Sequence, residues 1–378
     1  MEIKMSKKVT ICLNMIVRNE ERVIKRCLES VKPLIDYWVI VDTGSEDRTQ
    51  EIIRETLKDI PGELHERPWV NFAKNRTEAF LLAKNKGDLS LLIDADEMVV
   101  IEKDFVFPDA TQQAYLAEVH YERAIFHREL FINNQLDWYW EGLLHEQIYC
   151  KQKLERITIA KKIYNLSRPD GNRSLNPKKY EKDIEVLQKA LLEDPNNPRH
   201  MFYLAQSYAC NQDWEMASKT YLKRSQMQGW NQEVYYSLYA NGYMMERMGK
   251  DPYETIDAYA KAYQFRPSRV EPLFRVACLY FHCKQYALAK IIAKFGMEFP
   301  LSKDSMFVEP GLYQFGVRLL YADCCRALDE REEAIREYEK ISRIKDVPDE
   351  VLADIGQHII QLKLRPPKEL ALESVPYT

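Results

Sequence analysis

The sequence lacks the features that mark several common classes of protein. Its 54 lysine and arginine residues are balanced by 58 aspartate and glutamate residues, which argues against a basic surface for general nucleic-acid binding. No uninterrupted apolar run approaches the roughly 20 residues that cross a bilayer. The N-terminus leads directly into an expected strand and carries no cleavage site of small residues, so no signal peptide is expected. These absences predict a cytoplasmic protein without a transmembrane segment.

Cysteine spacing and composition indicate folded domains without structural zinc or disulfides. None of the eight cysteines forms a Cys-x-x-Cys pair, and reduced thiols are the simpler interpretation. A hydrophobic share of 46% and a charged share of 30% are typical of globular proteins. At roughly 150 residues per domain, the 378 residues allow two or three domains.

The first 175 residues alternate short apolar runs with amphipathic segments, which predicts strands alternating with helices. Expected strands cover residues 9–16, 38–41, 63–67 and 89–93, and expected helices cover residues 20–31, 45–58 and 72–84. Ser45 is a natural N-cap for the second of these helices. Longer strands are expected at residues 115–123, 124–131 and 157–163, with Asn133-Asn134 as a hairpin turn. This order predicts an α/β domain with a Rossmann-like, mainly parallel half and a mixed half.

From residue 176 onward the pattern is helical and repeats itself. After a leading helix at about residues 177–193, small residues recur 35, 37 and 45 positions apart, at Ala205, Ala240, Ala277 and Ala322. Twelve residues beyond three of them stand Ala217, Ala289 and Ala334, and an insertion puts Ile256 in this role in the second unit. A small residue on each helix, at a period near 34, lets paired helices approach closely, which resembles tetratricopeptide repeats. We expect domains at residues 1–175 and 176–363, and an extended tail at residues 364–378.

Acidic residues follow two of the expected strands. Asp94-Ala95-Asp96 comes directly after a buried strand, and Asp42 ends another. In open α/β sheets, ligands bind beyond the carboxyl ends of strands. Two carboxylates one residue apart can reach a divalent cation, which commonly bridges protein carboxylates to diphosphate oxygens. The pair therefore predicts a metal site, although surface turns also produce this pattern by chance. Asp42 could accept hydrogen bonds from a nucleotide, or it could cap the turn that follows.

Two further segments carry side chains suited to chemistry. Arg76 lies one turn into an expected helix and is suited to bidentate phosphate contact, although a lone helical arginine is usually a solvated ion-pair partner. Residues 138–146 place three aromatic residues before a glycine, a histidine and a glutamate. Aromatic rings stack on sugars, and Glu146 or His145 could remove a proton. The alternative is a core strand with a charged end.

Together these segments resemble family 2 glycosyltransferases of the GT-A fold, in the subgroup with tetratricopeptide repeats after the catalytic domain. The resemblance rests on five segments that occur in order and at fitting spacing: residues 14–20, 41–49, 71–76, 94–96 and 141–146. It implies a nucleotide-sugar donor, usually a uridine diphosphate sugar, a divalent cation (Mn²⁺ or Mg²⁺), and inversion at the anomeric carbon.

The resemblance also implies roles for residues near the donor. Asp42 would contact the uridine, and the backbone at Ile16 and Val17 would form the base pocket. Arg76 would lie near the nucleotide. Lys179 falls where relatives often carry basic residues near the mouth of the site, and it could contact the diphosphate or be an ordinary surface lysine.

A third set of roles concerns the cation and the reaction. Asp94 and Asp96 would hold the ribose and the metal–diphosphate group, with Asp96 the preferred residue for direct contact with the metal. Asn165 stands where many relatives carry a histidine, so the cation would gain only an amide oxygen there. Glu146 matches the catalytic base. Gly142 lies on the loop that approaches the donor, and His145 would support the base or contact the acceptor.

The acceptor and the role of the repeats stay open. The acceptor could be a saccharide, a lipid-linked group, or a peptide or protein, as in the bacteriocin S-glycosyltransferases that this architecture resembles. The repeats could present that acceptor or mediate a homodimer. A non-catalytic scaffold with a degenerate nucleotide-sugar-binding domain is the main alternative. A nucleotidyltransferase is disfavoured, because residues 14–20 contain no glycine for a phosphate loop.

Overall fold

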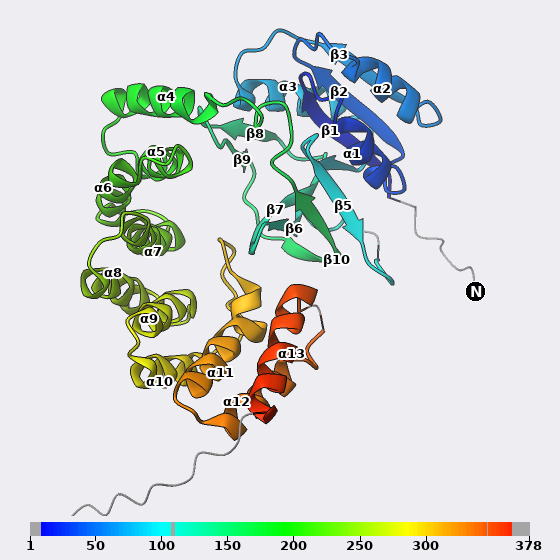
Figure 1. The fold of residues 1–378 in the computed structure, drawn as a ribbon. Coiled ribbons are helices and arrows are strands. Elements are labelled where there is room, and N and C mark those ends of the chain that lie inside the picture. Colours follow the sequence, from blue (N-terminus) through cyan, green and yellow to red (C-terminus); the bar gives the residue numbers. More distant parts are fainter. Residues whose placement is uncertain (1–8, 107–109, 346, 365–378) are drawn as a thin grey trace, which may run out of the picture. The chain divides into compact units, whose positions relative to one another are not determined.

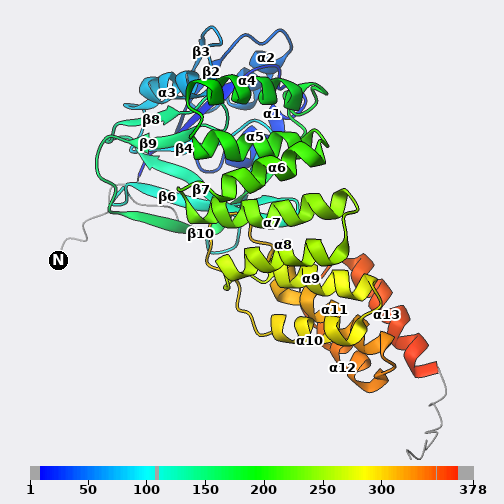
Figure 2. The same ribbon diagram turned by 90° about the vertical axis from the view of Figure 1, so that its left-hand side faces the viewer.

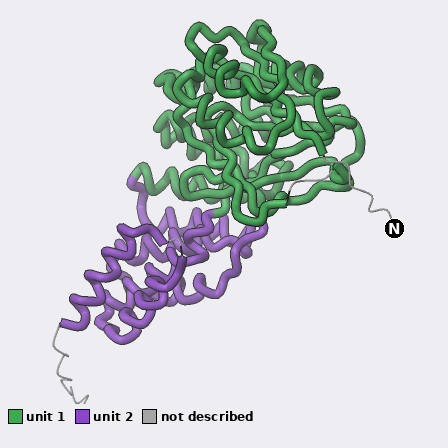
Figure 3. The backbone as a smooth tube through the Cα atoms, turned by 90° about the vertical axis from the view of Figure 1, so that its right-hand side faces the viewer, with its two compact units in different colours: residues 1–248, 304–308 green, residues 249–303, 309–378 purple. Residues whose placement is uncertain are grey.

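The computed structural model describes residues 9–106, 110–345 and 347–364, and they form two compact units (Figure 3). The first unit runs to Met248 and includes Asp304–Val308, and the second comprises Gly249–Lys303 and the residues from Glu309 on. The first unit therefore contains the sheet and the first helices of the repeat region. No helix within the described ranges is both long and apolar enough to cross a bilayer.

The first unit is built on an eight-stranded mixed sheet in the order β3-β2-β1-β4-β7-β6-β10-β5 (Figure 1). Its strands are β1 (Ile11–Val17), β2 (Tyr37–Asp42), β3 (Gly62–Glu66), β4 (Leu89–Leu92), β5 (Glu97–Ile101), β6 (Ala114–Tyr121), β7 (Ala124–Asn133) and β10 (Ile157–Ser167). Strands β3, β2, β1 and β4 are parallel, whereas β7 runs antiparallel to both β4 and β6. The predicted α/β domain, parallel in one half and mixed in the other, is confirmed.

Helices cover both faces of the parallel half, which is why its strands are apolar on both sides. These helices are α1 (Ile24–Val31), α2 (Thr49–Thr56) and α3 (Phe72–Ala83). The apolar side of α1 packs in the main core with alternate residues of β1, such as Leu13 and Met15. On the opposite face, Asn14 donates a hydrogen bond to the Ala79 carbonyl of α3 across 2.9 Å. This contact fixes α3 beside β1 and thereby sets the place of Arg76.

Two local predictions in this unit are wrong. Asn133-Asn134 does not join paired strands, because the turn between β6 and β7 lies at residues 122–123 and β7 does not pair with the next strand. Asn134 instead bonds the Gly87 carbonyl and the Ser90 hydroxyl. Ser45 is not an N-cap either, because α2 begins at Thr49 without a side-chain cap. Ser45 also has a partner from elsewhere in the fold, because its Oγ accepts from the Asn19 amide across 2.9 Å. The side chains of Asn134 and Ser45 therefore make tertiary contacts in place of the local roles that the sequence pattern predicted.

Three strands that are not among the expected ones frame the acidic and aromatic segments. Strand β5 begins at Glu97, directly after Asp94-Ala95-Asp96, and pairs antiparallel with β10. Strands β8 (Trp138–Glu141) and β9 (Gln147–Cys150) form a separate two-stranded sheet. The loop between β8 and β9, residues 142–146, carries Glu146.

The remaining elements are helices that follow one another along the chain (Figure 2). In the first unit they are α4 (Lys179–Glu193), α5 (Pro198–Cys210), α6 (Trp214–Ser225) and α7 (Asn231–Arg247). In the second unit they are α8 (Pro252–Phe265), α9 (Glu271–His282), α10 (Tyr286–Gly296), η1 (Leu312–Gly316), α11 (Val317–Ala327), α12 (Arg331–Ile341) and α13 (Asp349–Leu364). The expected tail lies outside the described residues, apart from Leu364 at the end of α13.

The small residues of the repeats are buried as their spacing predicts. Ala205, Ala277 and Ala322 are each 0% exposed, and so are their partners twelve residues further on. On α8 the prediction was wrong, because Ile256 is only half-buried whereas Ala262 is fully buried. Thr255, one residue before Ile256, is 1% exposed and is the fourth residue of its helix, as Ala217, Ala289 and Ala334 are of theirs. The all-helical, tetratricopeptide-like region is otherwise confirmed.

Candidate active site

The predicted residues gather beyond the carboxyl ends of β1, β2 and β4. Strand β1 lies between β2 and β4. The strand order therefore reverses at β1, with β2 and β3 added on one side of it and β4 on the other. Such a switch point is where open α/β sheets bind ligands. Asp42 is the last residue of β2, and Asp94 follows β4 by two residues. The sheet therefore brings two carboxylates that are distant in sequence to one edge.

Arg76 joins the acidic motif to the loop between β8 and β9. Its Nε donates to Glu146 Oε1 across 2.6 Å, and its Nη2 donates to Asp94 Oδ1 across 2.5 Å. The side chains of Arg76 and Glu146 are 19% and 11% exposed, so this ion pair is shielded from solvent. Asn71 places Arg76 one turn into α3, because its side chain caps that helix by accepting from the Lys74 amide.

Arg128 on β7 and Glu97 on β5 extend this contact on the other side of Asp94. Arg128 donates to Asp94 Oδ2 across 3.4 Å and also binds Glu97. Glu97 in turn accepts from the Asp94 amide across 3.2 Å. The result is an alternating row of acids and arginines that ends at Glu146. Arg128 and Glu97 are not among the predicted site residues; the available signals were an arginine within the expected strand at residues 124–131 and an acid directly after the Asp94-Ala95-Asp96 motif.

The two acids inside this row respond to it in opposite ways. Burial opposes ionisation of Asp94, but the charges of Arg76 and Arg128 outweigh it and lower the pKa of this carboxyl. Burial raises the pKa of Glu97, with the charge of Asp94 adding to the effect and Arg128 opposing it. Asp94 is therefore held as a carboxylate by two guanidinium groups.

Asp96 has a different environment. Within the described ranges, no cation pairs with its carboxylate, and burial together with the charges of Asp94 and Glu97 raises its pKa to about 6. Its backbone carbonyl accepts from Arg26 and from the Arg168 amide. Gly171 lies so close that a Cβ there would meet the Asp96 side chain at 2.9 Å. Asp96 is thus a crowded carboxylate whose oxygens form no ion pair among the described residues.

Asn165 lies in β10 and is 1% exposed. Its Nδ2 is 3.5 Å from Glu97 Oε2, and its Oδ1 has no hydrogen-bond partner among the described residues. A buried amide oxygen without a partner costs about 1–3 kcal/mol. The oxygen is therefore available as a ligand, whereas the amide nitrogen faces an acid.

These donors bear on the predicted cation. No cluster of three or more histidine, cysteine or acidic residues suited to a metal ion occurs in the part of the chain that the structure describes. Both Asp94 oxygens already bind arginines, which leaves Asp96 as the unpaired carboxylate. This donor set suits a cation that takes one protein carboxylate and completes its shell with phosphate oxygens and water, as Mg²⁺ commonly does.

Asp42 combines the two alternatives left open by the sequence. Its Oδ1 accepts from the amides of Gly44 and Ser45 at 2.8 and 2.7 Å, so it does cap the turn. Its Oδ2 is buried without a hydrogen-bond partner among the described residues. Val17 lies beside this turn, where its carbonyl accepts from the amide of Thr43. The remaining oxygen of Asp42 is free to accept from a ligand.

The other predicted residues lie around the loop between β8 and β9. Gly142 has φ 121°, in a region that favours glycine. His145 stacks on Tyr203, and burial, followed by the charges of Arg173, Lys179 and Arg199, lowers its pKa well below its usual range. At neutral pH His145 is therefore an uncharged ring. The ammonium of Lys179 lies 4.9 Å from the ring centroid of Tyr180, and burial lowers its pKa.

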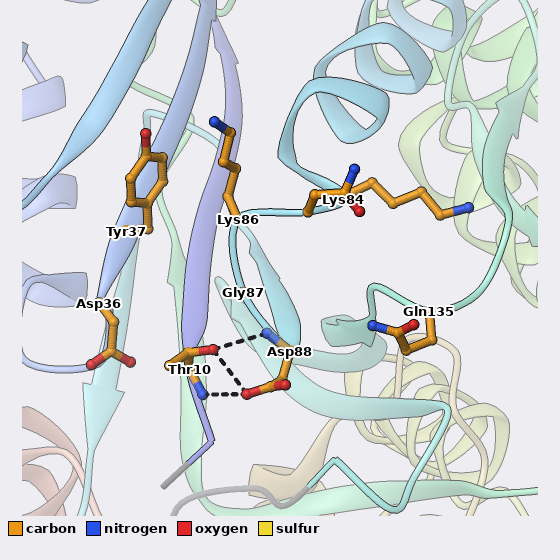
Figure 4. A pocket seen from close by; sticks show the side chains of 9 residues that line it. Thr10, Asp36, Tyr37, Lys84, Lys86, Gly87, Asp88 and Gln135 are labelled. Atoms are coloured by element: carbon orange, nitrogen blue, oxygen red, sulfur yellow. Dashed lines mark hydrogen bonds between the residues drawn. The ribbon is translucent and has the colours of Figure 1, made fainter.

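A polar cavity of about 620 Å³ lies at the other end of the strands, where β1 and β2 begin (Figure 4). Its lining includes Thr10 and Tyr37, which lie where β1 and β2 begin, and Asp88, which bonds Thr10 across 2.8 Å. None of the predicted site residues lines it. The two lysines on its wall bind the acids Asp137 and Glu63. This cavity is therefore separate from the candidate active site.

Comparison with known proteins shows what the N-terminal part of the chain is similar to. Residues 12–104 match the family model described as glycosyl transferase family 2. This part of the chain is therefore similar to family 2 glycosyltransferases. The match covers β1 to β5, and so it includes Asp42, Arg76 and the Asp94-Ala95-Asp96 motif.

Individual relatives and solved structures are similar to parts of the chain. The SPbeta prophage-derived glycosyltransferase SunS of Bacillus subtilis is 24% identical over 234 residues, 57% of this chain and 53% of that protein. A TPR repeat-containing protein of Synechococcus elongatus is 39% identical over 94 residues, 25% of this chain and 22% of that protein. The crystal structure of MamA has a TM-score of 0.37 and 15% identity, over 47% of this chain and 92% of that one. The chain thus spans between about a fifth and a half of the length of these two curated relatives.

Proposed function

We propose that this protein transfers a sugar from a nucleotide diphosphate sugar, most simply a uridine diphosphate sugar, to an acceptor nucleophile. The observation that carries the proposal is the position of Arg76, which holds Glu146 and Asp94 together at the switch point of a family 2 domain. The proposed base and the acidic motif that would hold the donor then lie on the two sides of one guanidinium group.

The reaction would be a single displacement. The acceptor hydroxyl attacks the anomeric carbon while Glu146 takes the hydroxyl proton, and the bond from that carbon to the diphosphate oxygen breaks. Attack from the face opposite the leaving group inverts the anomeric configuration. General-base assistance of this kind contributes roughly 10²–10⁴-fold.

The edge of the sheet would bind the donor. The free oxygen of Asp42 suits an N–H donor of the base, near the backbone at Ile16 and Val17. Asp96 would hold a divalent cation, Mn²⁺ or Mg²⁺, and Asn165 Oδ1 is a second oxygen in the same acidic region. When bound, such a cation would neutralise charge on the diphosphate. Lys179 and Arg76 would add positive charge on the protein side.

The identity of the acceptor is a separate part of the proposal. A saccharide, a lipid-linked group and a peptide or protein all present a nucleophile that Glu146 could deprotonate. The helical repeats form the sort of surface that binds extended peptides, and a homodimer through the repeats is the competing use of that surface.

A panel of nucleotide sugars tests the proposal without knowledge of the acceptor. Slow hydrolysis of UDP-glucose, UDP-galactose, UDP-N-acetylglucosamine and GDP-mannose would be followed by release of the nucleotide diphosphate, with and without Mn²⁺. Thermal unfolding with uridine diphosphate plus Mn²⁺ reports binding, because a ligand of the native state raises the melting temperature.

The two measurements separate an enzyme from a scaffold. We expect hydrolysis of at least one sugar nucleotide and a cation-dependent shift. The full occupation of Asp94 by arginines favours the alternative of a degenerate domain, which predicts neither hydrolysis nor a shift. Absence of both would overturn the proposed transfer activity.

A further inference from the structure

The loop of residues 142–146 is anchored in the helical repeats as well as in the sheet. Leu144 packs against a core built mainly by α4 to α7, which includes buried residues such as Leu187 and Phe202. Two residues later, Glu146 points back to Arg76. The chain therefore changes direction at His145, between one side chain that belongs to the repeats and one that belongs to the site.

His145 makes this change of direction with an unusual backbone and a ring stack. Its φ is 52°, a left-handed value that few residues other than glycine and asparagine adopt. Its imidazole lies parallel to the ring of Tyr203 on α5, with centroids 4.1 Å apart and 6° between planes. Such a backbone persists only where its surroundings hold it.

Arg199, one turn before Tyr203 on α5, supplies the second part of that support. Its Nη2 donates to the His145 carbonyl across 3.2 Å, and its guanidinium lies 5.0 Å from the centroid of the Tyr203 ring. Its Nη1 reaches Glu233 on α7 at 3.3 Å. Glu233 is itself held by Arg224, whose side chain is fully buried. Arg199 is thus fixed from α7 and in turn holds the loop.

The loop is short and closed, so a displacement of His145 reaches Glu146. A Cβ at Gly142 would lie only 3.2 Å from the Cα of Glu146, which shows how tightly the two ends of the loop approach. Glu146 and its 2.6 Å bond to Arg76 directly follow the carbonyl that Arg199 holds. A misplacement of about 1 Å at a reacting group can cost 10²-fold in rate.

We infer that Arg199 and Tyr203 are positioning residues for Glu146, so that the first helices of the repeat region complete the active site. The inference rests on the proposed function in so far as Glu146 is the base. It also makes a purely structural claim, that α5 fixes the loop, which can be tested without any substrate.

The test compares Arg199→Met with Arg247→Met in the full-length protein. Arg247 is the matched control, because its guanidinium lies 4.9 Å from the Trp214 ring centroid and makes no described contact with the loop. Arg199→Met leaves Glu233 paired with Arg224, so no buried acid loses its last partner. Labelled histidine would be observed by NMR, with the signal of His145 identified by its loss in His145→Gln.

We expect the ring protons of His145 to be shifted upfield by the Tyr203 ring in the wild type and in Arg247→Met, and this shift to be lost in Arg199→Met. Turnover of the sugar nucleotide that the wild type hydrolyses should fall about 100-fold in Arg199→Met, while the affinity for uridine diphosphate plus Mn²⁺ stays unchanged. Arg199→Lys should recover part of the turnover, because an ammonium can still donate to the carbonyl.

A second pair of variants covers the case in which Arg199→Met does not fold. Tyr203→Phe keeps the stacked ring and should keep wild-type turnover, whereas Tyr203→Leu should lose it at unchanged nucleotide affinity. An unchanged His145 signal in folded Arg199→Met would overturn the inference, and so would a lost signal with unchanged turnover, or equal turnover in the two Tyr203 variants. If the wild type hydrolyses no sugar nucleotide, the proposed function fails, and the His145 signal still decides whether α5 holds the loop.

Discussion

Arg76 donates a hydrogen bond across 2.6 Å to Glu146, a residue 70 positions further along the chain. The same guanidinium binds Asp94. The proposed base and the acidic motif are therefore coupled through one side chain, and a change at Arg76 acts on both.

Replacing Arg76 with methionine should lower turnover at least about 100-fold, because Glu146 loses the partner that orients it. Asp94 keeps Arg128, so the protein should still fold. Arg67→Met is the matched control. Arg67 precedes α3 and pairs with Glu78 of that helix at 2.6 Å, but both side chains are more than a third exposed. Such surface pairs contribute about 0–1 kcal/mol. Steady-state kinetics and thermal unfolding of both variants check this, and equal turnover in the two would contradict it.

Glu146→Gln should lower the turnover number by roughly 10²–10⁴-fold and leave donor affinity unchanged. The amide keeps an oxygen that can accept from Arg76, so the geometry of the loop is retained while the capacity to take a proton is lost. Isothermal titration with uridine diphosphate plus Mn²⁺, beside the kinetic assay, separates the two effects. Native turnover in this variant would show that another group removes the acceptor proton.

Asp96→Asn should abolish the dependence of uridine diphosphate binding on Mn²⁺, because it removes the only carboxylate of the motif that is not held by arginine. Asp104→Asn is the control, since that side chain is 70% exposed and its φ of 64° suits asparagine. Titrations with and without Mn²⁺ measure the effect. A cation dependence that survives in Asp96→Asn would exclude Asp96 as the ligand.

The raised pKa of the Glu20 carboxyl leads us to expect that the stability of the protein depends on pH. Burial, with the charges of Asp96 and Asp47 adding to it, raises its pKa from 4.5 to about 7, although the Asn172 amide opposes the shift. The folded state therefore binds a proton that the unfolded state has released, and Glu20 destabilises the fold progressively as pH rises from about 4.5 to about 7.

Glu20→Gln should consequently become more stable than the wild type across that pH range, with a constant difference above it. Thermal unfolding of both proteins at intervals of pH measures the difference. Glu29→Gln, a change at a side chain that is 59% exposed, should follow the wild-type curve. A difference between wild type and Glu20→Gln that does not change with pH would contradict the assigned shift.

The small residues of the repeats predict a difference between two alanines of α10. Ala289 is fully buried, whereas Ala287 on the same helix is exposed. Ala289→Leu should destabilise the protein by about 1–3 kcal/mol through overpacking, and Ala287→Leu should stay within about 0.5 kcal/mol. Urea unfolding monitored by circular dichroism measures both. Equal stabilities would mean that close helix approach at Ala289 is not required.

The local elements and the place of the strand-end acids follow from the amino-acid sequence alone. Apolar periodicity gave β1, β2, β4 and α3 to within one or two residues, because burial on both faces demands apolar side chains at fixed intervals. It also placed Asp42 and Asp94 at the carboxyl ends of strands. These ends lie on the same side of a parallel sheet. The buried alanines of the repeats followed from their spacing for the same reason.

The contacts between side chains of the site depend instead on how the strands and helices pack together. Arg128 reaches Asp94 because β7 lies next to β4, and β5 returns to pair with β10 at the far edge. Arg199 reaches the His145 carbonyl across 54 positions of the chain. Strand order and helix docking set these contacts, and both arise from packing over the whole unit. A local pattern of residues carries no information about that packing. That is why the sequence indicated the acids of the site and Arg76, but neither Arg128 nor Arg199.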